Sequence, residues 1–183
     1  LEEAQRKLYL AELRRSREQV LQTVQEKGLS RSRLQVLAAL TRLRQICCHP
    51  TLVGSDCASG KTETLFELLE PLLAEGQKVL VFSQFVSMLK LIKEALDTEK
   101  ITYSYLDGST KDRQSLVDEF NDNESLTVFL ISLKAGGTGL NLTGADTVIH
   151  FDPWWNPAVE DQATDRAHRI GQTKVVTVYR LVA

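Results

Sequence analysis

The chain has 183 residues, of which 43% are hydrophobic, 25% charged and 7% aromatic. This length fits one globular domain or one piece of a longer protein, and the composition excludes disordered, collagen-like and low-complexity chains. No apolar run reaches the roughly 18–20 residues that a membrane span needs. The charged start of the chain also lacks the apolar stretch of a secretory signal. We therefore expect an intracellular protein with no membrane partner.

The charge is distributed unevenly along the chain. The formal net charge is −2, yet residues 1–57 hold ten Lys and Arg against six Asp and Glu, whereas residues 58–183 hold twelve against eighteen. A nucleic acid would therefore have to bind a local patch, because the field of the whole chain does not attract phosphate.

The few cysteines give no sign of a disulfide framework. Cys47 and Cys48 are adjacent, and Cys57 is the third, which fits a reducing compartment. With His49 they could suggest zinc, but adjacent cysteines point in different directions along a helix and no C-x-x-C pair is present. We predict no metal site.

Residues 1–57 show helical patterning without strand alternation. In the second half we expect Ser30 to cap a helix and Pro50 to stop it. One stripe of apolar residues at helical spacing consists of Leu34, Leu37, Leu40, Leu43 and Ile46. The arginines on its flanks, which fit either a solvated face or a DNA contact, are Arg31, Arg33, Arg42 and Arg44.

After residue 60 the pattern changes to short apolar runs that alternate with helical segments, which predicts an α/β fold with a parallel sheet and right-handed crossovers. The expected strands are Lys78–Ser83, Thr102–Leu106, Thr127–Ser132, Thr147–Phe151 and Val175–Leu181. The expected helices are Lys61–Ala74, Val86–Leu96, Lys111–Phe120 and Pro157–His168. Pro71 predicts a kink or an early end in the first of these helices.

Ligands of such sheets bind at the carboxyl ends of the strands, so the loops that follow the strands carry the candidate chemistry. The loop Lys134–Asn141 is rich in glycine, which lets backbone N–H groups approach an anion, and Lys134 adds a positive charge. A tight strand-to-helix turn needs glycine as well, so both interpretations stay open.

The last expected helix has clear boundary signals and a polar stripe. Asn156 and Pro157 suit its N-terminus, and Gly171 marks its far end. Three side chains at spacings i, i+4 and i+7 would share one narrow face: Gln162, Arg166 and Arg169. Arginine suits phosphate because its planar fork pairs with phosphate oxygens and stays charged. An ordinary solvated helix face explains the spacing equally well.

These residues carry a family resemblance that covers nearly the whole chain. The chain resembles the second, RecA-like motor lobe of the Swi/Snf family, ATP-driven translocases of double-stranded DNA within the helicase superfamilies. The doubled Trp154–Trp155 is more similar to bacterial members. The motifs that carry the resemblance are Leu43–Pro50, Val79–Phe85, Leu106–Thr110, Ile131–Leu142, Phe151–Pro157 and Asp161–Gln172.

The resemblance implies roles for particular residues. Arg166 and Arg169 resemble arginine fingers that reach the γ-phosphate of ATP, with Gln162 beside them. Gly139 and Asn141 match the nucleotide side of the glycine loop. The implied contacts to DNA are Ser83, Ser132, Lys134 and Trp155, whereas Trp154 can be a packed residue. Contacts of this kind to the DNA backbone are independent of sequence and sensitive to salt.

The resemblance also implies half of a motor. Residues 1–58 would be the helical inter-lobe segment, and 59–183 the second lobe without its C-terminal helix. ATP and Mg²⁺ would be held mainly by an absent first lobe of the same polypeptide, so this chain alone should not hydrolyse ATP. Its partners would be double-stranded DNA and DNA-bound proteins that the motor remodels. We expect it in the bacterial cytoplasm with the nucleoid, or in the nucleus of a eukaryote.

Two alternatives remain. The chain could be a non-catalytic DNA-binding or interaction module, in which only Lys134 and Trp155 matter. It could instead be a self-sufficient nucleotide enzyme that uses Lys61, since Ser59–Thr62 contains the Gly-Lys-Thr end of a P-loop. The first glycine of that motif is out of register, because Ser55 occupies its position.

Overall fold

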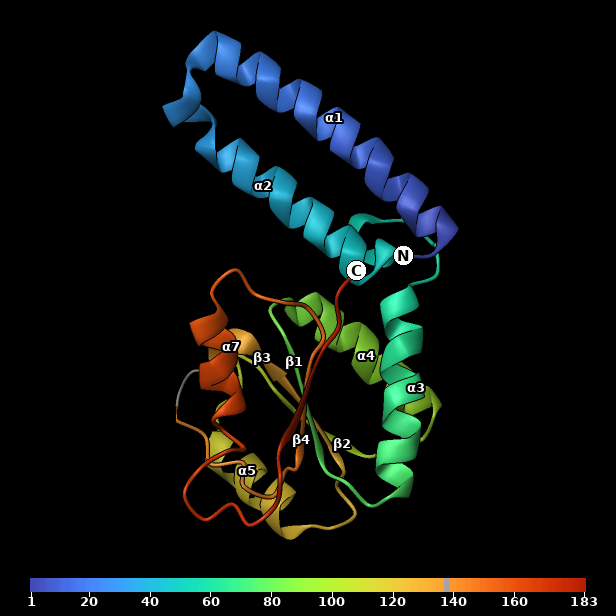
Figure 1. Cartoon of the computed structure of the whole chain (residues 1–183), viewed down its shortest axis with the longest axis vertical. Coiled ribbons are helices and arrows are strands. Elements are labelled where there is room, and N and C mark those ends of the chain that lie inside the picture. The colour runs from blue at the N-terminus through green and yellow to red at the C-terminus, as the bar shows by residue number, and fades with distance from the viewer. Residues whose placement is uncertain (137–138) are drawn as a thin grey trace. The chain divides into compact units, whose positions relative to one another are not determined.

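The computed structural model describes residues 1–136 and 139–183, which form two compact units (Figure 1). The first unit comprises Leu1–Glu63 with Ala183, and the second comprises Thr64–Val182. The functional boundary expected between residues 58 and 59 stays a prediction. No described helix has both the length and the apolar content needed to span a membrane.

The first unit is built around a hairpin of two long helices, α1 (Glu3–Lys27) and α2 (Leu29–Cys48), followed by the short 3₁₀ helix η1 (Pro50–Val53). Gly28 joins the two helices with a φ of 77°, a left-handed value that favours glycine. At the other end of the hairpin, the buried Gln5 side chain donates to the carbonyl of Ile46 at 2.8 Å. This hydrogen bond fixes the start of α1 against the end of α2.

Helix α2 corrects two expectations. Ser30 does not cap it, because the helix already begins at Leu29 and Gly28 is its N-cap. The apolar stripe is not buried as a whole, since Leu34 is 80% exposed while Ile46 is fully buried. Steps of three residues turn by about 300°, so such a stripe winds around the helix instead of following one side. The helix does end at Cys48, two residues before Pro50, as predicted.

The second unit contains a five-stranded sheet in which every neighbouring pair is parallel, which confirms the predicted fold class. The strand order is β2-β3-β1-β4-β5. The strands are β1 (Val79–Ser83), β2 (Tyr103–Leu106), β3 (Val128–Ser132), β4 (Thr147–His150) and β5 (Thr177–Arg180). Their carboxyl ends therefore meet at one edge of the sheet.

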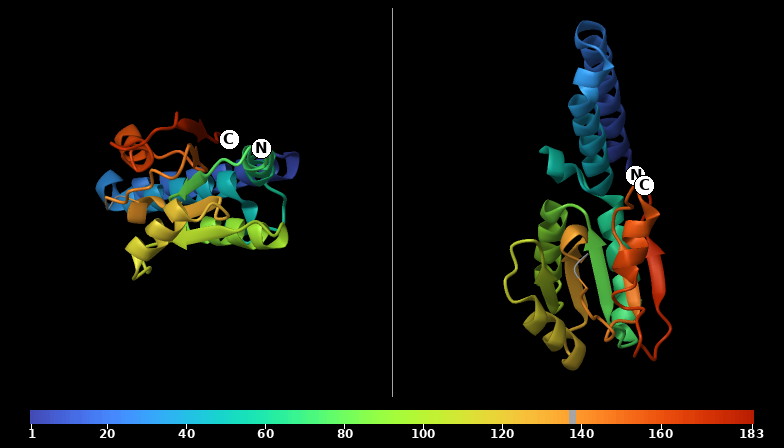
Figure 2. Two further views of the ribbon diagram at one scale, coloured as in Figure 1. Left: turned by 90° about the horizontal axis from the view of Figure 1, so that it is seen from below. Right: turned by 90° about the vertical axis from the view of Figure 1, so that its left-hand side faces the viewer.

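Helices cover both faces of this sheet. Helices α3 and α4 lie on one face, and helices α5, α6 and α7 lie on the other (Figure 2), as right-handed crossovers require. The bounds are α3 (Gly60–Ala74), α4 (Val86–Thr98), α5 (Arg113–Asp122), α6 (Leu133–Gly136) and α7 (Pro157–Thr164). Helix α3 continues through Pro71 to Ala74, so the early end expected there is wrong.

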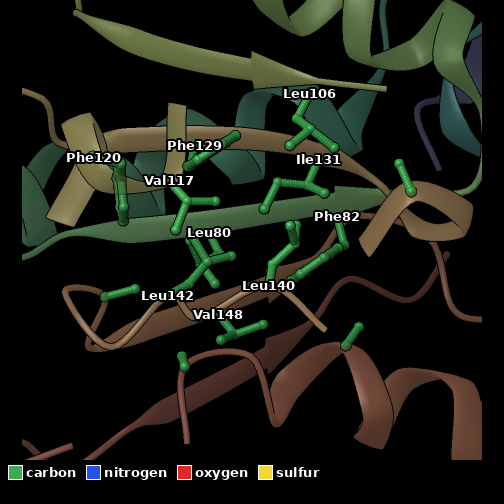
Figure 3. Packing of buried hydrophobic residues seen from close by; sticks show 14 of the residues in the cluster. Leu80, Phe82, Leu106, Val117, Phe120, Phe129, Ile131, Leu140, Leu142 and Val148 are labelled. Carbon is green, nitrogen blue, oxygen red and sulfur yellow. The ribbon is translucent and has the colours of Figure 1, made fainter. Parts of the chain in front are cut away.

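The core follows from the alternation of side chains along the strands. All residues of β1, β3 and β4 are buried, as expected for central strands covered on both faces. Leu80 and Phe82 of β1 point toward the face of α5 and pack with Val117, Phe129 and Val148 (Figure 3). This packing gives the loops at the carboxyl edge a rigid base.

Candidate functional site

Asp152 connects two of the loops at the carboxyl edge of the sheet. It follows β4, and one of its carboxylate oxygens accepts a hydrogen bond from the Ser83 hydroxyl while the other accepts from the Gln84 N–H at 3.1 Å. The Ser83 hydroxyl also accepts from the Phe85 N–H at 3.1 Å. Ser83 was expected to contact a DNA phosphate, but its side chain is buried and bonded within the protein.

The glycine-rich loop begins later than expected. Lys134 lies in the single helical turn α6 and is exposed to solvent, so it does not belong to the loop itself. Ser132 is buried at the end of β3, where its hydroxyl accepts from the Ala135 N–H at 3.3 Å. The expected loop residues Gly137 and Thr138 lie outside the described part of the chain.

The second half of that loop is held by its backbone. Gly139 has a φ of 73°, which glycine adopts without strain. The Asn141 carbonyl accepts from Asn121 Nδ2 at 2.8 Å, while the Asn141 residue itself is exposed. Gly139 and Asn141, the two predicted nucleotide-side residues, are therefore exposed, and the hydrogen bond from Asn121 holds the loop backbone in place.

The two tryptophans differ in their surroundings. The Trp154 side chain packs against the hydrophobic core, and the Trp154 backbone N–H donates to Glu160 Oε1 at 2.8 Å. Trp155 is 56% exposed, and its ring meets the Trp154 ring edge to face at a centroid distance of 6.4 Å. A cavity of about 320 Å³ beside Trp154 is lined by Gln84, Phe85, Leu133, Lys134, Trp154 and Val159. Lys134 is thus an exposed residue at this hollow, and the exposed Trp155 follows Trp154 in the chain.

The N-terminus of α7 is as predicted, but its C-terminus is not. Asn156 caps the helix by accepting from the Ala158 N–H at 3.0 Å, and Pro157 occupies the first turn. The helix ends at Thr164, well before His168 and Gly171. The single helical stripe expected for Gln162, Arg166 and Arg169 is therefore wrong.

Tertiary hydrogen bonds explain this early end. In a continuing helix the Arg166 carbonyl would accept from the N–H four residues later, but here it accepts from the Leu142 N–H at 2.8 Å. The Arg166 and Ala167 N–H groups donate to carbonyls three residues back, so the chain continues in tighter turns. The segment after α7 is shaped by the glycine loop instead of by helical periodicity.

The tighter turns still bring the three polar candidates together. Gln162, Arg166 and Arg169 line one open depression of about 610 Å³, with further lining from Asp165, His168 and Ile170. Arg169 is exposed and donates from Nη1 to the carbonyls of Gly139 at 3.2 Å and Leu140 at 3.1 Å. The predicted arginines and the predicted glycine loop are therefore in direct contact.

Arg166 is the side chain whose environment calls for an anion. The residue is 7% exposed, and its buried Nε has no hydrogen-bond partner. Burial, and then the nearby charge of Arg169, lower the pKa of Arg166, while Asp165 acts in the opposite direction. Since a guanidinium stays charged in proteins, a bound phosphate would supply an acceptor and add negative charge to that of Asp165.

Two residues that support the site escaped the sequence analysis as site residues. Gln172 donates from Nε2 to the carbonyls of Thr143, Ala145 and Ala167, so it fixes the chain that follows the glycine loop to the segment that carries Arg166 and Arg169, here called the arginine segment. Glu160 is buried and bonds to Trp154 and, through Oε2, to Arg180 Nε at 2.7 Å. No local pattern could have paired Glu160 with Arg180, which lies twenty positions later.

Two other sequence features gain no support as sites. No strand precedes Lys61 in the described residues, whereas a P-loop lies between a strand and a helix; Lys61 sits in the first turn of α3. Cys47, Cys48, His49 and Cys57 form no metal-binding cluster, and no such group of His, Cys, Asp and Glu exists among residues 1–136 and 139–183.

Known proteins share this fold and its sequence motifs. Residues 60–171 match the family model of the helicase conserved C-terminal domain. The fold matches the Sulfolobus solfataricus SWI2/SNF2 ATPase C-terminal domain with a TM-score of 0.77 and 34% identity, over 98% of this chain and 74% of that one. The chain therefore belongs to the helicase C-terminal domain family, in its Swi2/Snf2 branch, which confirms the resemblance seen in the sequence.

Further relatives extend the comparison. The Sulfolobus solfataricus SWI2/SNF2 ATPase core in complex with dsDNA matches with a TM-score of 0.82 and 36% identity, over 100% of this chain and 39% of that one. Protein CHROMATIN REMODELING 19 of Arabidopsis thaliana is 54% identical over 126 residues, which are 68% of this chain and 16% of that protein. The chain spans only 15–17% of the length of three curated relatives that it matches.

Proposed function

We propose that this chain is the second lobe of an ATP-dependent translocase that moves on double-stranded DNA. In this role it supplies Arg166 to the phosphates of an ATP molecule held by another lobe. Arg169 and Gln162 lie beside Arg166 at the same depression, and Arg169 contacts Gly139 of the glycine loop. We propose that Gly139 and the exposed Asn141 lie on the nucleotide side of that loop. Membership of the Swi2/Snf2 branch supports this proposal.

The observation that carries the proposal is the unpartnered Nε of the buried Arg166. A buried donor without an acceptor costs free energy, on the order of 1–3 kcal/mol, unless a ligand satisfies it. A γ-phosphate offers such acceptors, and an arginine that reaches it stabilises the charge of the transition state. The described residues offer no cluster of carboxylates for Mg²⁺. We therefore propose that the other lobe holds Mg²⁺ and makes most of the contacts with ATP.

The exposed residues at the other side of the carboxyl edge suit the DNA backbone. Lys134 offers a positive charge at the hollow beside β1, and Trp155 offers an exposed ring next to Trp154, which lines that hollow. Contacts of this lobe to phosphates would position it without reading bases, so we propose binding that is independent of sequence. The buried hydroxyls of Ser83 and Ser132 would contact phosphate only after their internal hydrogen bonds break.

The proposed cycle needs both sites on one rigid lobe. When the cleft between the lobes closes on ATP, Arg166 completes the nucleotide site; when it opens, the DNA contacts of this lobe shift along the backbone. Proteins bound to DNA would be displaced or remodelled as the motor moves. The proposed location is where such DNA lies, the bacterial nucleoid or a eukaryotic nucleus.

Substitution of Arg166 in the full polypeptide that contains this chain tests the proposal. Arg166→Ala should lower DNA-stimulated ATP hydrolysis by about 10³-fold while duplex binding persists. Arg17→Ala, on the exposed surface of α1, is the control with the same loss of charge. Normal DNA-stimulated turnover and normal DNA binding in R166A would instead favour a non-catalytic DNA-binding module, in which Arg166 is dispensable.

A further inference from the structure

Glu160 lies at the meeting point of three elements. It belongs to α7, and its two carboxylate oxygens bond in different directions. Oε1 accepts from the Trp154 N–H at 2.8 Å in the loop before the helix, and Oε2 accepts from Arg180 Nε at 2.7 Å in β5. The side chain is only 6% exposed. One carboxylate thus joins the tryptophan loop, α7 and an edge strand of the sheet.

Glu160 stays ionised although its carboxylate is buried. Burial acts to raise its pKa, but the hydrogen bonds from Arg180 and from the Trp154 N–H outweigh burial and hold the pKa below its ordinary value. A buried ion pair is seldom a better source of stability than apolar side chains of the same volume. What the carboxylate provides here is geometry, because two donors from separate elements must both reach it.

Helix α7 connects the two halves of the proposed site. Trp155 precedes its capped N-terminus, and Gln162 and the arginine segment lie at its C-terminal end. Eight helical residues span only about 12 Å, so a displacement at one end is transmitted to the other. Glu160, in the first turn, is the point where this short rod is fixed to the sheet through Arg180.

We propose that Glu160, held by Arg180, is a positioning residue that couples DNA contact at Trp155 to the placement of Arg166. This inference rests on the proposed function. When Trp155 meets DNA, the force on its loop passes through the Trp154 N–H to Glu160 and thus to α7. Without the carboxylate the loop is held to α7 and β5 less firmly, and DNA no longer accelerates ATP hydrolysis as strongly.

The first test uses this chain and needs no ATP. Its two tryptophans both lie in the loop, so their fluorescence reports the loop alone. Glu160→Gln should increase the quenching of this fluorescence by acrylamide, whereas Asp161→Asn should not. Asp161 is a stringent control because it is the next residue on the helix, carries the same charge and lies 3.7 Å from Arg180 Nη2, with a side chain that is 69% exposed. D161N therefore weakens an exposed ion pair to Arg180 and leaves the bond between Glu160 and the Trp154 backbone in place. Equal quenching in the two variants would overturn the inference.

The second test measures coupling in the full polypeptide. At saturating duplex DNA, E160Q should lower kcat for ATP about ten- to a hundredfold, while KM for ATP and the affinity for DNA change less than about threefold. Arg180→Lys keeps a cationic donor and should retain most of the stimulation, which Arg180→Gln should lose. A purely structural role would lower DNA affinity, kcat and the melting temperature together and raise KM for ATP, and would contradict the inference.

The outcomes separate this inference from the proposed function. If the unaltered polypeptide shows no DNA-stimulated hydrolysis, the proposed function fails and the coupling role fails with it. If the unaltered protein is stimulated and E160Q is stimulated as strongly as D161N, only the coupling role is wrong.

Discussion

Arg169 donates a hydrogen bond to the carbonyl of Gly139 at 3.2 Å, and thereby ties the arginine segment to the glycine loop thirty residues earlier. A second bond from the same nitrogen reaches the Leu140 carbonyl. Arg166 differs, since its buried Nε has no partner. Of the two candidate arginines, one supports the loop and the other lacks an acceptor.

This difference predicts opposite effects on stability. Arg169→Ala should lower the free energy of unfolding by about 1–2 kcal/mol, because the loop carbonyls lose a charged donor. Arg166→Met, which fills similar space without an unsatisfied donor, should leave stability unchanged or raise it. Urea unfolding of this chain measures both. A larger loss of stability in R166M than in R169A would show that Arg166 has a structural partner.

A small residue is required at Gly136, where the helical turn α6 passes over the sheet. A Cβ atom added there would lie 2.8 Å from Cε1 of Phe82, which is itself buried in the core. Gly136→Ala should therefore destabilise the chain by about 1–3 kcal/mol through overpacking. Gly108→Ala is the matched control, because nothing lies within 4 Å of its Cβ position. The melting temperatures of the two variants decide, and equal values would contradict the packing described.

The stability of the chain should fall on mild acidification because of His150. Burial lowers the pKa of His150 below its ordinary value of 6.5; Glu160 opposes this effect and Arg180 adds to it. Below pH 6.5 the unfolded chain takes up a proton that the folded chain resists. The stabilisation is therefore complete above about pH 6.5 and is lost as the pH falls toward the folded pKa, at no more than about 1.4 kcal/mol per pH unit.

Substitution isolates this contribution from that of the carboxylates. His150→Asn should flatten the dependence of the unfolding free energy on pH between about 6.5 and 5, relative to the unaltered chain. His168→Asn serves as the control, since His168 is exposed. An unchanged pH dependence in H150N would mean that His150 protonates equally in the folded and unfolded states.

The two tryptophans should respond differently to substitution. Trp155→Ala removes an exposed ring and should weaken duplex DNA binding with little change in melting temperature. Trp154→Ala removes a ring packed on the core and should lower the melting temperature. Titrations with two duplexes of unrelated sequence at two salt concentrations measure the first effect, and binding should fall with salt for both. If W155A binds as the unaltered chain does, the ring is not a DNA contact.

Much of the fold could be predicted because its signals are local. The expected strand Lys78–Ser83 is found as Val79–Ser83, and the cap at Asn156 forms as predicted, since apolar runs and capping residues act over a few positions. The end of α7 could not be predicted in this way. It depends on the Leu142 N–H reaching the Arg166 carbonyl, and a periodic pattern contains no information about that contact.

The candidate site also combines features that the sequence predicts with features that only tertiary contacts determine. Motif resemblance named Arg166 and Arg169, but only the structure distinguishes the arginine whose buried Nε has no partner from the one bonded to the loop. The resemblance named Ser83 as a DNA contact, and its bond to Asp152 could not be foreseen because the two residues lie 69 positions apart. Sequence identifies which residues reach the edge of the sheet, and tertiary hydrogen bonds decide what they can do there.

The central claim, that this chain is one lobe of a two-lobe motor, is tested most directly by steady-state ATP hydrolysis. The chain and the full polypeptide that contains it would be compared with and without duplex DNA. The claim predicts no turnover by the chain under either condition, and DNA-stimulated turnover by the full polypeptide that R166A abolishes. ATP hydrolysis by the chain alone would contradict it, and would return Lys61 to consideration as a phosphate-binding residue.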